Sequence, residues 1–322
     1  MTAESIFCLS KCHSHPTLLI LILCLSFGND CMRYRQNVVQ GALFILLSEL
    51  MFASMGAAVK AASGMGLSNE MLVFMRNLMG LFIITPLLMR YEAAELRTSV
   101  YKLHLLRALL GLSAMYSFFF VLGKLELADG MLLKMTAPIF MPLIALLWLG
   151  ERVGRLAILA IPIGFVGVGL VLKPGGDMSW VALVGVMGGA LAAFAKVTVR
   201  RLGRSESTTR IVFYFALNAT VISALPLVWS WQLPSQQQWM LLGLMGAMGT
   251  AGQLLLTRGY AVAAAAQVSP FTYFSVVFGA GYGYLFWGEI LDWLFVAGAV
   301  LIAISGVMAV RGLGRKQVST AI

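Results

Sequence analysis

The stretch LWLGERVGRL, from Leu147 to Leu156, returns in the second half of the chain as LFWGEILDWL, from Leu285 to Leu294. Both stretches place a Gly-Glu pair directly after a long apolar run. Shorter matches elsewhere in the two halves recur at the same offset or within two positions of it. Because weak internal similarity at a steady offset is typical of membrane proteins built from structural repeats, the two stretches predict a duplicated fold.

The composition identifies the environment of this fold. The chain has 322 residues, of which 60% are hydrophobic and 11% are charged, whereas soluble domains carry about 25% charged residues. The apolar residues form runs of about 20, which is the length of a helix that crosses a bilayer. A helix that is apolar on all sides lies in lipid or in a large core. We therefore predict an all-α polytopic membrane protein.

The apolar runs and the repeat together predict the domain organisation. Because five helices per repeat is an odd number, the second repeat would enter the membrane upside down. The expected repeats span residues 36–175 and 176–314, between an N-terminal extension (1–35) outside the fold and a cytoplasmic tail (315–322). We predict ten transmembrane helices in two inverted five-helix repeats, at about 39–59, 71–89, 104–122, 128–149, 156–173, 179–199, 210–231, 237–258, 265–287 and 291–311.

The basic residues between the helices predict the orientation. With the N-terminus inside, the inner segments hold sixteen Lys and Arg residues and the outer segments hold three. Cytoplasmic loops carry such an excess, so both termini are predicted to be cytoplasmic, in a cell (inner) membrane. No basic stripe with interleaved aromatic residues lies outside the apolar runs, so the net charge of +10 does not indicate nucleic-acid binding.

Three segments of the chain resemble a known family. They are RNLMGLFIITPLL (Arg76–Leu88), HLLRALLGLSAMYSFFFVL (His104–Leu122) and LADGMLLKMTAPIFMPLIALLWLGERV (Leu127–Val153). They are similar to the EamA-type branch of the drug/metabolite transporter superfamily, some of whose members are similar to riboflavin importers. The resemblance implies a central substrate cavity lined by the first four helices of each repeat, and a flavin, amino acid or related metabolite as substrate.

Catalytic motifs are missing from the sequence. It contains no GxxxxGK[ST] loop, no HExxH and no GxSxG, so we expect no catalytic residue, no metal site and no cofactor. The leading hypothesis is a secondary or facilitative transporter with a small-molecule substrate. A membrane scaffold or sensor and a membrane-embedded enzyme remain the alternatives, and proton coupling and a homodimer stay open.

Polar residues within the predicted helices are the candidates for the substrate site. Charged groups inside a bilayer cost about 2.5–3.5 kcal/mol each on insertion scales, so they usually face a cavity or a partner. A structural ion pair is the alternative for Glu49, and Lys196 is expected to extend to the interface. The predicted substrate-binding residues are Glu49, Arg76, Tyr116, Lys134, Gln253 and Tyr273.

The inverted arrangement gives the Gly-Glu pairs a structural interpretation. Glu151 and Glu289 would lie on opposite faces of the membrane, so one substrate site cannot use both in the same way. We interpret each as a turn residue whose carboxylate lies near the exposed N–H groups of the following helix. A contact in a gate is the alternative.

Overall fold

The computed structural model describes residues 38–88, 97–149, 155–171, 180–202, 205–206, 208–262 and 269–314. Every regular element in these ranges is helical, which confirms the all-α part of the predicted fold class; the ten spans and the inverted repeat stay predictions. The expected extension (1–35) and the expected tail (315–322) lie outside the described residues, as does Glu151. Four helical segments are long and apolar enough to cross a membrane: Val39–Gly64, Tyr101–Leu122, Trp180–Val199 and Gln236–Leu256.

The first half of the chain forms helices near the predicted positions: α3 (Val38–Gly64), α4 (Asn69–Leu88), α5 (Tyr101–Leu122), α6 (Leu127–Lys134), α7 (Ala137–Leu149) and α8 (Arg155–Val171). Helix α3 is longer than predicted and ends at a glycine turn. Gly66 has a φ of 86°, which is the left-handed conformation that commonly ends a helix. The N–H of Gly66 donates to the carbonyl of Ser63 at 3.0 Å, so this carbonyl in the last turn has a hydrogen-bond partner.

The second half has α9 (Trp180–Leu202), α10 (Thr208–Ala224), α11 (Leu227–Ser230), α12 (Gln236–Val262), the 3₁₀ helix η1 (Ser269–Tyr273), α14 (Phe274–Trp287) and α15 (Trp293–Gly314). The prediction of one helix over 210–231 was wrong, because the helix is interrupted at Leu225 and Pro226. Proline has no N–H to continue the ladder, so α11 is a separate turn.

One predicted helix in each repeat departs from regular α-helical geometry at an equivalent position, through a break in the first repeat and a change from 3₁₀ to α geometry in the second. The predicted helix 128–149 is broken between α6 and α7, at Met135 and Thr136, and the predicted helix 265–287 changes from η1 to α14 after Tyr273. Met135 and Tyr273 are separated by the same offset as the two Gly-Glu pairs. At the first break, the N–H of Met135 donates to the carbonyl of Leu132, at 2.9 Å. Pro138 follows and has no N–H for the next bond of the ladder.

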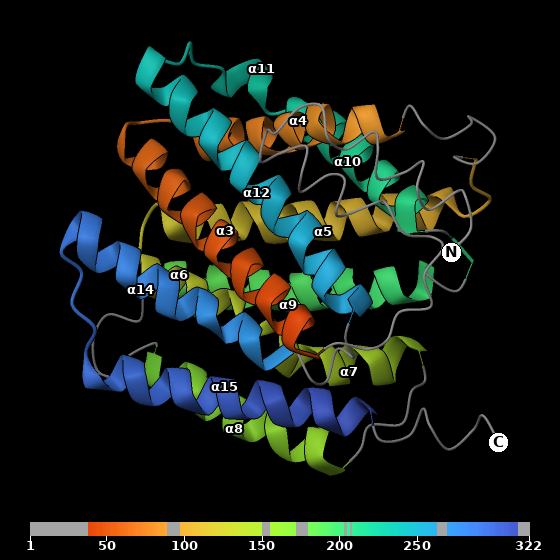
Figure 1. Ribbon diagram of the computed structural model, residues 1–322, viewed down its shortest axis with the longest axis vertical. Helices are drawn as coiled ribbons and strands as arrows, with labels where there is room; N and C mark the ends of the chain where they lie inside the picture. The colour runs from red at the N-terminus through yellow and green to blue at the C-terminus, as the bar shows by residue number, and fades with distance from the viewer. Residues whose placement is uncertain are drawn as a thin grey trace, which may run out of the picture.

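The helices of the two halves pack in reciprocal pairs (Figure 1). Helix α3 packs on α12 and α5 packs on α9, so the first helix of each half contacts the third helix of the other. Each remaining helix packs on its own counterpart: α4 on α10, α6 on α14 and α8 on α15. The pair α8 and α15 lies along one edge of the molecule in Figure 1, where a Cβ atom at Gly167 would lie 3.0 Å from the α15 backbone, so the absence of a side chain permits the close approach.

Candidate functional site

Five charged side chains from five helices interact electrostatically in the middle of the bundle. They are Glu49 on α3, Arg76 on α4, Arg107 on α5, Lys134 at the end of α6 and Lys196 on α9, which we call the central charge cluster. Glu49 interacts with both lysines, and each arginine interacts with another cation of the set. Glu49 and Lys134 thus interact directly, and Arg76 is linked to them through Arg107 and Lys196. That these residues bind a substrate stays a prediction.

Glu49 is the acid of this cluster and is almost fully buried. The residue is 3% exposed, and its Oε2 atom has no hydrogen-bond partner among the described residues. Ser275 of α14 interacts with the carboxylate, and Lys134 and Lys196 act on it from α6 and α9. A buried carboxylate oxygen without a donor is costly unless another group or water reaches it, so this atom is available to a bound molecule.

Lys134 lies at the break between α6 and α7, where the helix ladder is interrupted. Its Nζ atom is 4.6 Å from the ring centroid of Phe52 and 5.5 Å from that of Phe118. Aromatic faces attract an ammonium group, but they do not neutralise its charge. Within the described residues, Lys134 has no ion pair within 4.0 Å, so the break presents a cation held by two rings.

The two arginines are also incompletely paired. Nη1 of Arg76 donates to Oδ1 of Asn77 over 3.4 Å, which is a long hydrogen bond. The guanidinium carbon of Arg107 lies 4.1 Å from the ring centroid of Phe215. Nε and Nη1 of Arg107 are buried and have no hydrogen-bond partner among the residues that the structure describes. Guanidinium groups with unused donors are suited to bind carboxylate or phosphate oxygens.

Sequence reasoning missed two members of the cluster. Arg107 was counted with the inner helix ends, because the helix was expected to begin at 104. Helix α5 begins at Tyr101, which places Arg107 nearly two turns inside it. Lys196 was expected to extend to the interface, but the structure brings it into the electrostatic range of Glu49, Lys134 and Arg107. The residue lies at the surface of the described helices.

The other predicted site residues occupy different surroundings. Tyr116 is half-buried and its hydroxyl has no hydrogen-bond partner in the described part of the chain, so this hydroxyl is available. Gln253 is exposed, whereas Thr250, on the same predicted face, is buried. Tyr273 is not brought together with the cluster, because its hydroxyl donates to the carbonyl of Ile302 on α15 at 3.2 Å.

A partly buried ion pair lies at one end of the bundle, which we call the Lys60 end. Nζ of Lys60, near the end of α3, lies 2.5 Å from Oε1 of Glu289 and donates to the carbonyl of Leu125 at 2.6 Å. Oε2 of Glu289 accepts a 2.8 Å hydrogen bond from the N–H of Leu127, the first residue of α6. One carboxylate thus holds α3, α6 and the end of α14 together.

This geometry explains one of the two Gly-Glu pairs and corrects the role predicted for its Glu. Gly288 ends α14 in the left-handed conformation, with a φ of 66°, as glycine commonly does after a helix. The carboxylate of Glu289 does not bind the N–H groups at the start of the following helix, α15. It accepts the N–H of Leu127 at the start of α6 instead. Asp292 takes the predicted role, and its Oδ1 accepts the N–H of Phe295 in α15 at 2.8 Å.

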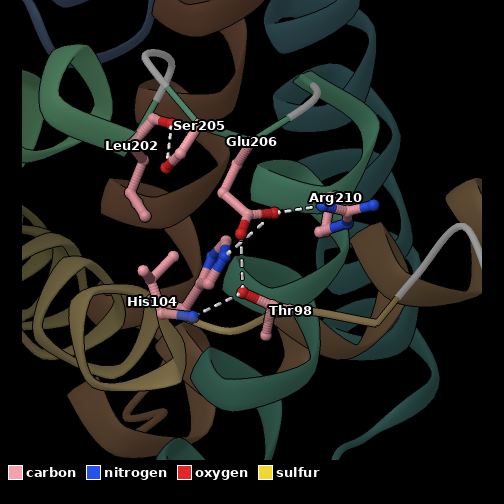
Figure 2. Close-up of polar contacts among 7 residues, drawn as sticks. Thr98, His104, Leu202, Ser205, Glu206 and Arg210 are labelled. Carbon is pink, nitrogen blue, oxygen red and sulfur yellow. Dashed lines mark hydrogen bonds and ion pairs between the residues drawn. The ribbon is translucent and has the colours of Figure 1, made fainter.

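A second polar network lies at the opposite end, which we call the Glu206 end (Figure 2). Oε2 of Glu206 is 2.6 Å from Nη1 of Arg210 and 3.9 Å from Nε2 of His104, and Oε1 accepts the Thr98 hydroxyl at 2.8 Å. Burial pushes the pKa of Glu206 up, but hydrogen bonds from Arg210 and Thr98 outweigh it and hold the pKa below its ordinary value. The carboxylate therefore stays ionised and links α5, α10 and the segment before α10.

Replacing Glu206 with Gln should lower the free energy of unfolding by about 1.5–3 kcal/mol at pH 7, because charge-assisted hydrogen bonds are lost. Since the folded pKa is depressed, this stabilisation is present above the unfolded pKa of about 4.3 and is lost as the pH falls through the folded pKa. Unfolding of both proteins in detergent, followed from pH 7 down to about pH 3, should show the gap closing. A gap that stays constant with pH would contradict this assignment, and Glu126→Gln at an exposed position is the matched control.

No group of three or more His, Cys, Asp or Glu side chains that could hold a metal ion occurs among the described residues. The unsatisfied buried atoms of the cluster are two guanidinium nitrogens of Arg107 and one carboxylate oxygen of Glu49. Such groups are suited to hydrogen-bond with a polar solute.

Comparisons with known families, sequences and structures identify relatives of this chain. Residues 39–173 and 179–311 each match the EamA-like transporter family. The chain is 35% identical to the pseudopaline exporter CntI of Pseudomonas aeruginosa, over 82% of this chain and 94% of that protein. It is 29% identical to a riboflavin transporter of Vibrio cholerae, over 85% and 94% of the two chains. A solved structure aligns with a TM-score of 0.58 and 17% identity, over 84% of this chain and 96% of that one, which supports the fold alone.

Proposed function

Because this chain belongs to the EamA-like transporter family, we propose that it carries a small organic metabolite across the membrane by alternating access between two inverted five-helix repeats. The ten helical segments that this requires are α3, α4, α5, α6–α7, α8, α9, α10–α11, α12, η1–α14 and α15. With the charge bias of the loops, both termini are cytoplasmic in a cell inner membrane.

Reciprocal packing supports the inverted arrangement. If the two repeats are exchanged, the contact of α3 with α12 becomes the contact of α9 with α5, and both contacts exist. The same exchange leaves three other contacts unchanged: α4 with α10, α6 with α14 and α8 with α15. This is the pattern expected when a two-fold axis relates the repeats, and the odd number of helices proposed for each repeat would place that axis in the membrane plane.

The proposal rests mainly on an irregular point that equivalent helices of the two repeats share. The α6–α7 break and the η1–α14 junction lie at equivalent positions of the two repeats, with Lys134 at the first of them. Interrupted helices at corresponding positions are where transporters of this construction place their substrates, because backbone groups there are free of the helix ladder. We assign the substrate site to Glu49, Arg76, Lys134, Tyr116 and Gln253.

Uptake and efflux in proteoliposomes test this proposal. The solutes are riboflavin, S-adenosylmethionine and amino acids, because the relatives include riboflavin transporters, a S-adenosylmethionine uptake transporter of Rickettsia bellii and an exporter. We expect the wild-type protein to move at least one solute of this kind, and Lys134→Gln to move it at least about tenfold more slowly. Lys124→Gln, at an exposed position after α5, is the control. If no solute moves under any gradient, the proposal fails.

A further inference from the structure

The central charge cluster has far more positive than negative charge. It contains four cations, Arg76, Arg107, Lys134 and Lys196, and one acid, Glu49. If all five groups of the cluster are ionised, the net charge is three positive units (4 − 1 = 3). A net charge of this size between membrane-spanning helices is energetically costly unless a counter-charge joins it.

The donors of this cluster are also unsatisfied. Nε and Nη1 of Arg107 have no hydrogen-bond partner in the described part of the chain, and Arg76 has one long bond, to Asn77. Lys134 is held by the rings of Phe52 and Phe118. The described protein thus offers aromatic faces and long contacts to these cations instead of carboxylates.

A structural explanation would require the cations to be neutralised by the fold, as at the two ends of the bundle. There, Lys60 has Glu289 at 2.5 Å and Arg210 has Glu206 at 2.6 Å. Lys60 and Arg210 at the ends therefore each have an acid within ion-pair distance, unlike the cations of the central charge cluster. In the described structure, no salt bridge within 4.0 Å is formed by Arg76, Arg107 or Lys134.

We infer that the substrate of this site is an organic anion with at least two carboxylate or phosphate groups. This inference rests on the proposed function, because it assigns the substrate class of the same site. Arg76 and Arg107 bind oxygens through their free N–H groups, and Lys134 and Lys196 supply further positive charge at the helix break. Glu49 opposes the charge of the anion and partly offsets the charge of the two lysines. The rings of Phe52 and Phe118 leave one side of Lys134 apolar, which suits a substrate with a carbon skeleton.

The test measures binding at equilibrium, apart from transport. Thermal unfolding of the purified protein in an uncharged detergent is followed with tricarballylate, succinate, butyrate, succinamide and 1,4-diaminobutane, at one ionic strength set with sodium chloride. These probes are similar in size and differ in charge. We expect the unfolding temperature to rise with the number of carboxylates, and to stay unchanged with succinamide and 1,4-diaminobutane.

Variants identify the residues responsible. Arg107→Gln combined with Lys134→Gln should weaken tricarballylate binding by at least about tenfold, because two charge-assisted contacts are lost. Glu49→Gln should have the opposite effect and strengthen binding, because it removes the charge that repels the anion. Lys102→Gln, at an exposed position on α5, should change nothing. Because the Glu49 variant has the opposite sign, the test stays decisive even if the double variant does not fold.

Each remaining outcome has a defined meaning. Stabilisation by succinamide or 1,4-diaminobutane instead of the carboxylates, or tighter carboxylate binding in the double variant, would overturn the inference. Competition by added phosphatidylglycerol would assign the cations to a lipid headgroup and would also overturn it. A protein that binds tricarballylate but moves no solute contradicts transport alone, and one that transports a neutral solute without binding carboxylates contradicts the anion alone.

Discussion

Replacing Glu289 with Gln is expected to open the Lys60 end and to raise the labelling rate of a cysteine at position 54 by at least about tenfold. Ser54 lies six residues before Lys60 on α3 and is half-buried, so it is about 9 Å deeper along the helix. The side chains of Lys60 and Glu289 are 16% and 9% exposed. Because this pair is partly buried, breaking it on one side costs less than the about 3–5 kcal/mol of a fully buried pair, but about 1.4 kcal/mol already corresponds to a factor of ten in a population.

The labelling experiment uses an impermeant thiol reagent on membrane vesicles. The native cysteines, all within the first 31 residues, are replaced with serine. Glu126→Gln is the matched control, because Glu126 precedes α6 at the same end, is exposed and makes no side-chain cap. Lys60→Gln combined with Glu289→Gln should label no faster than Glu289→Gln alone, since the pair is already broken. An unchanged rate in Glu289→Gln would mean that this pair does not hold the end closed.

The Lys60 pair has a sequence counterpart at the opposite end, which extends the argument to both faces. Glu151 matches Glu289 at the offset of the repeat, and Arg200 follows Lys60 at nearly the same offset. Arg201 lies over the ring of Trp148 at 5.8 Å, much as Lys60 lies over the ring of Trp287 at 5.6 Å. Glu151 is outside the described residues, so an ionic contact with Arg200 or Arg201 stays a prediction from the repeat. Two equivalent contacts, opened in turn, would provide the gates of an alternating cycle.

The sequence was sufficient for the features that depend on composition and periodicity. Long apolar runs predict membrane helices because lipid tolerates no unpaired backbone, and the recurring Gly-Glu pair indicates the repeat. Buried charges are also readable, since Glu49 and Lys134 are conspicuous in apolar surroundings. These signals are local, and they located most of the helices and part of the cluster.

The features that the sequence missed depend on tertiary contacts. Pro138 was not enough to predict the break after Lys134, because a proline does not by itself show which backbone carbonyls lose their helical hydrogen bonds. Arg107 looked like a helix-end charge until the start of α5 was seen at Tyr101. Tyr273 is a strong candidate by residue type, yet its orientation toward Ile302 follows from the packing of η1 on α15. The neighbouring residues in the sequence do not indicate these tertiary contacts.

The second large effect is expected at the helix break itself. Lys134→Cys removes a cation from the central charge cluster and should lower the transport rate by at least about tenfold, because one charge-assisted contact with the substrate is lost. Reaction of that cysteine with a small reagent that carries an ammonium group should restore part of the rate. Reaction with a neutral reagent of the same size should not, and this separates the role of the charge from that of the volume.

The central claim is that one site at the helix break is reached alternately from the two faces of the membrane. Its most direct test is the labelling of Lys134→Cys by an impermeant thiol reagent, applied first to one face of sealed vesicles and then to the other. Met131→Cys is the control, because Met131 is fully buried on the same helix. We predict that position 134 is labelled from both faces, that a transported solute slows labelling from either face, and that position 131 is not labelled. Labelling of position 134 from one face alone, with the transport cycle running, would contradict the account.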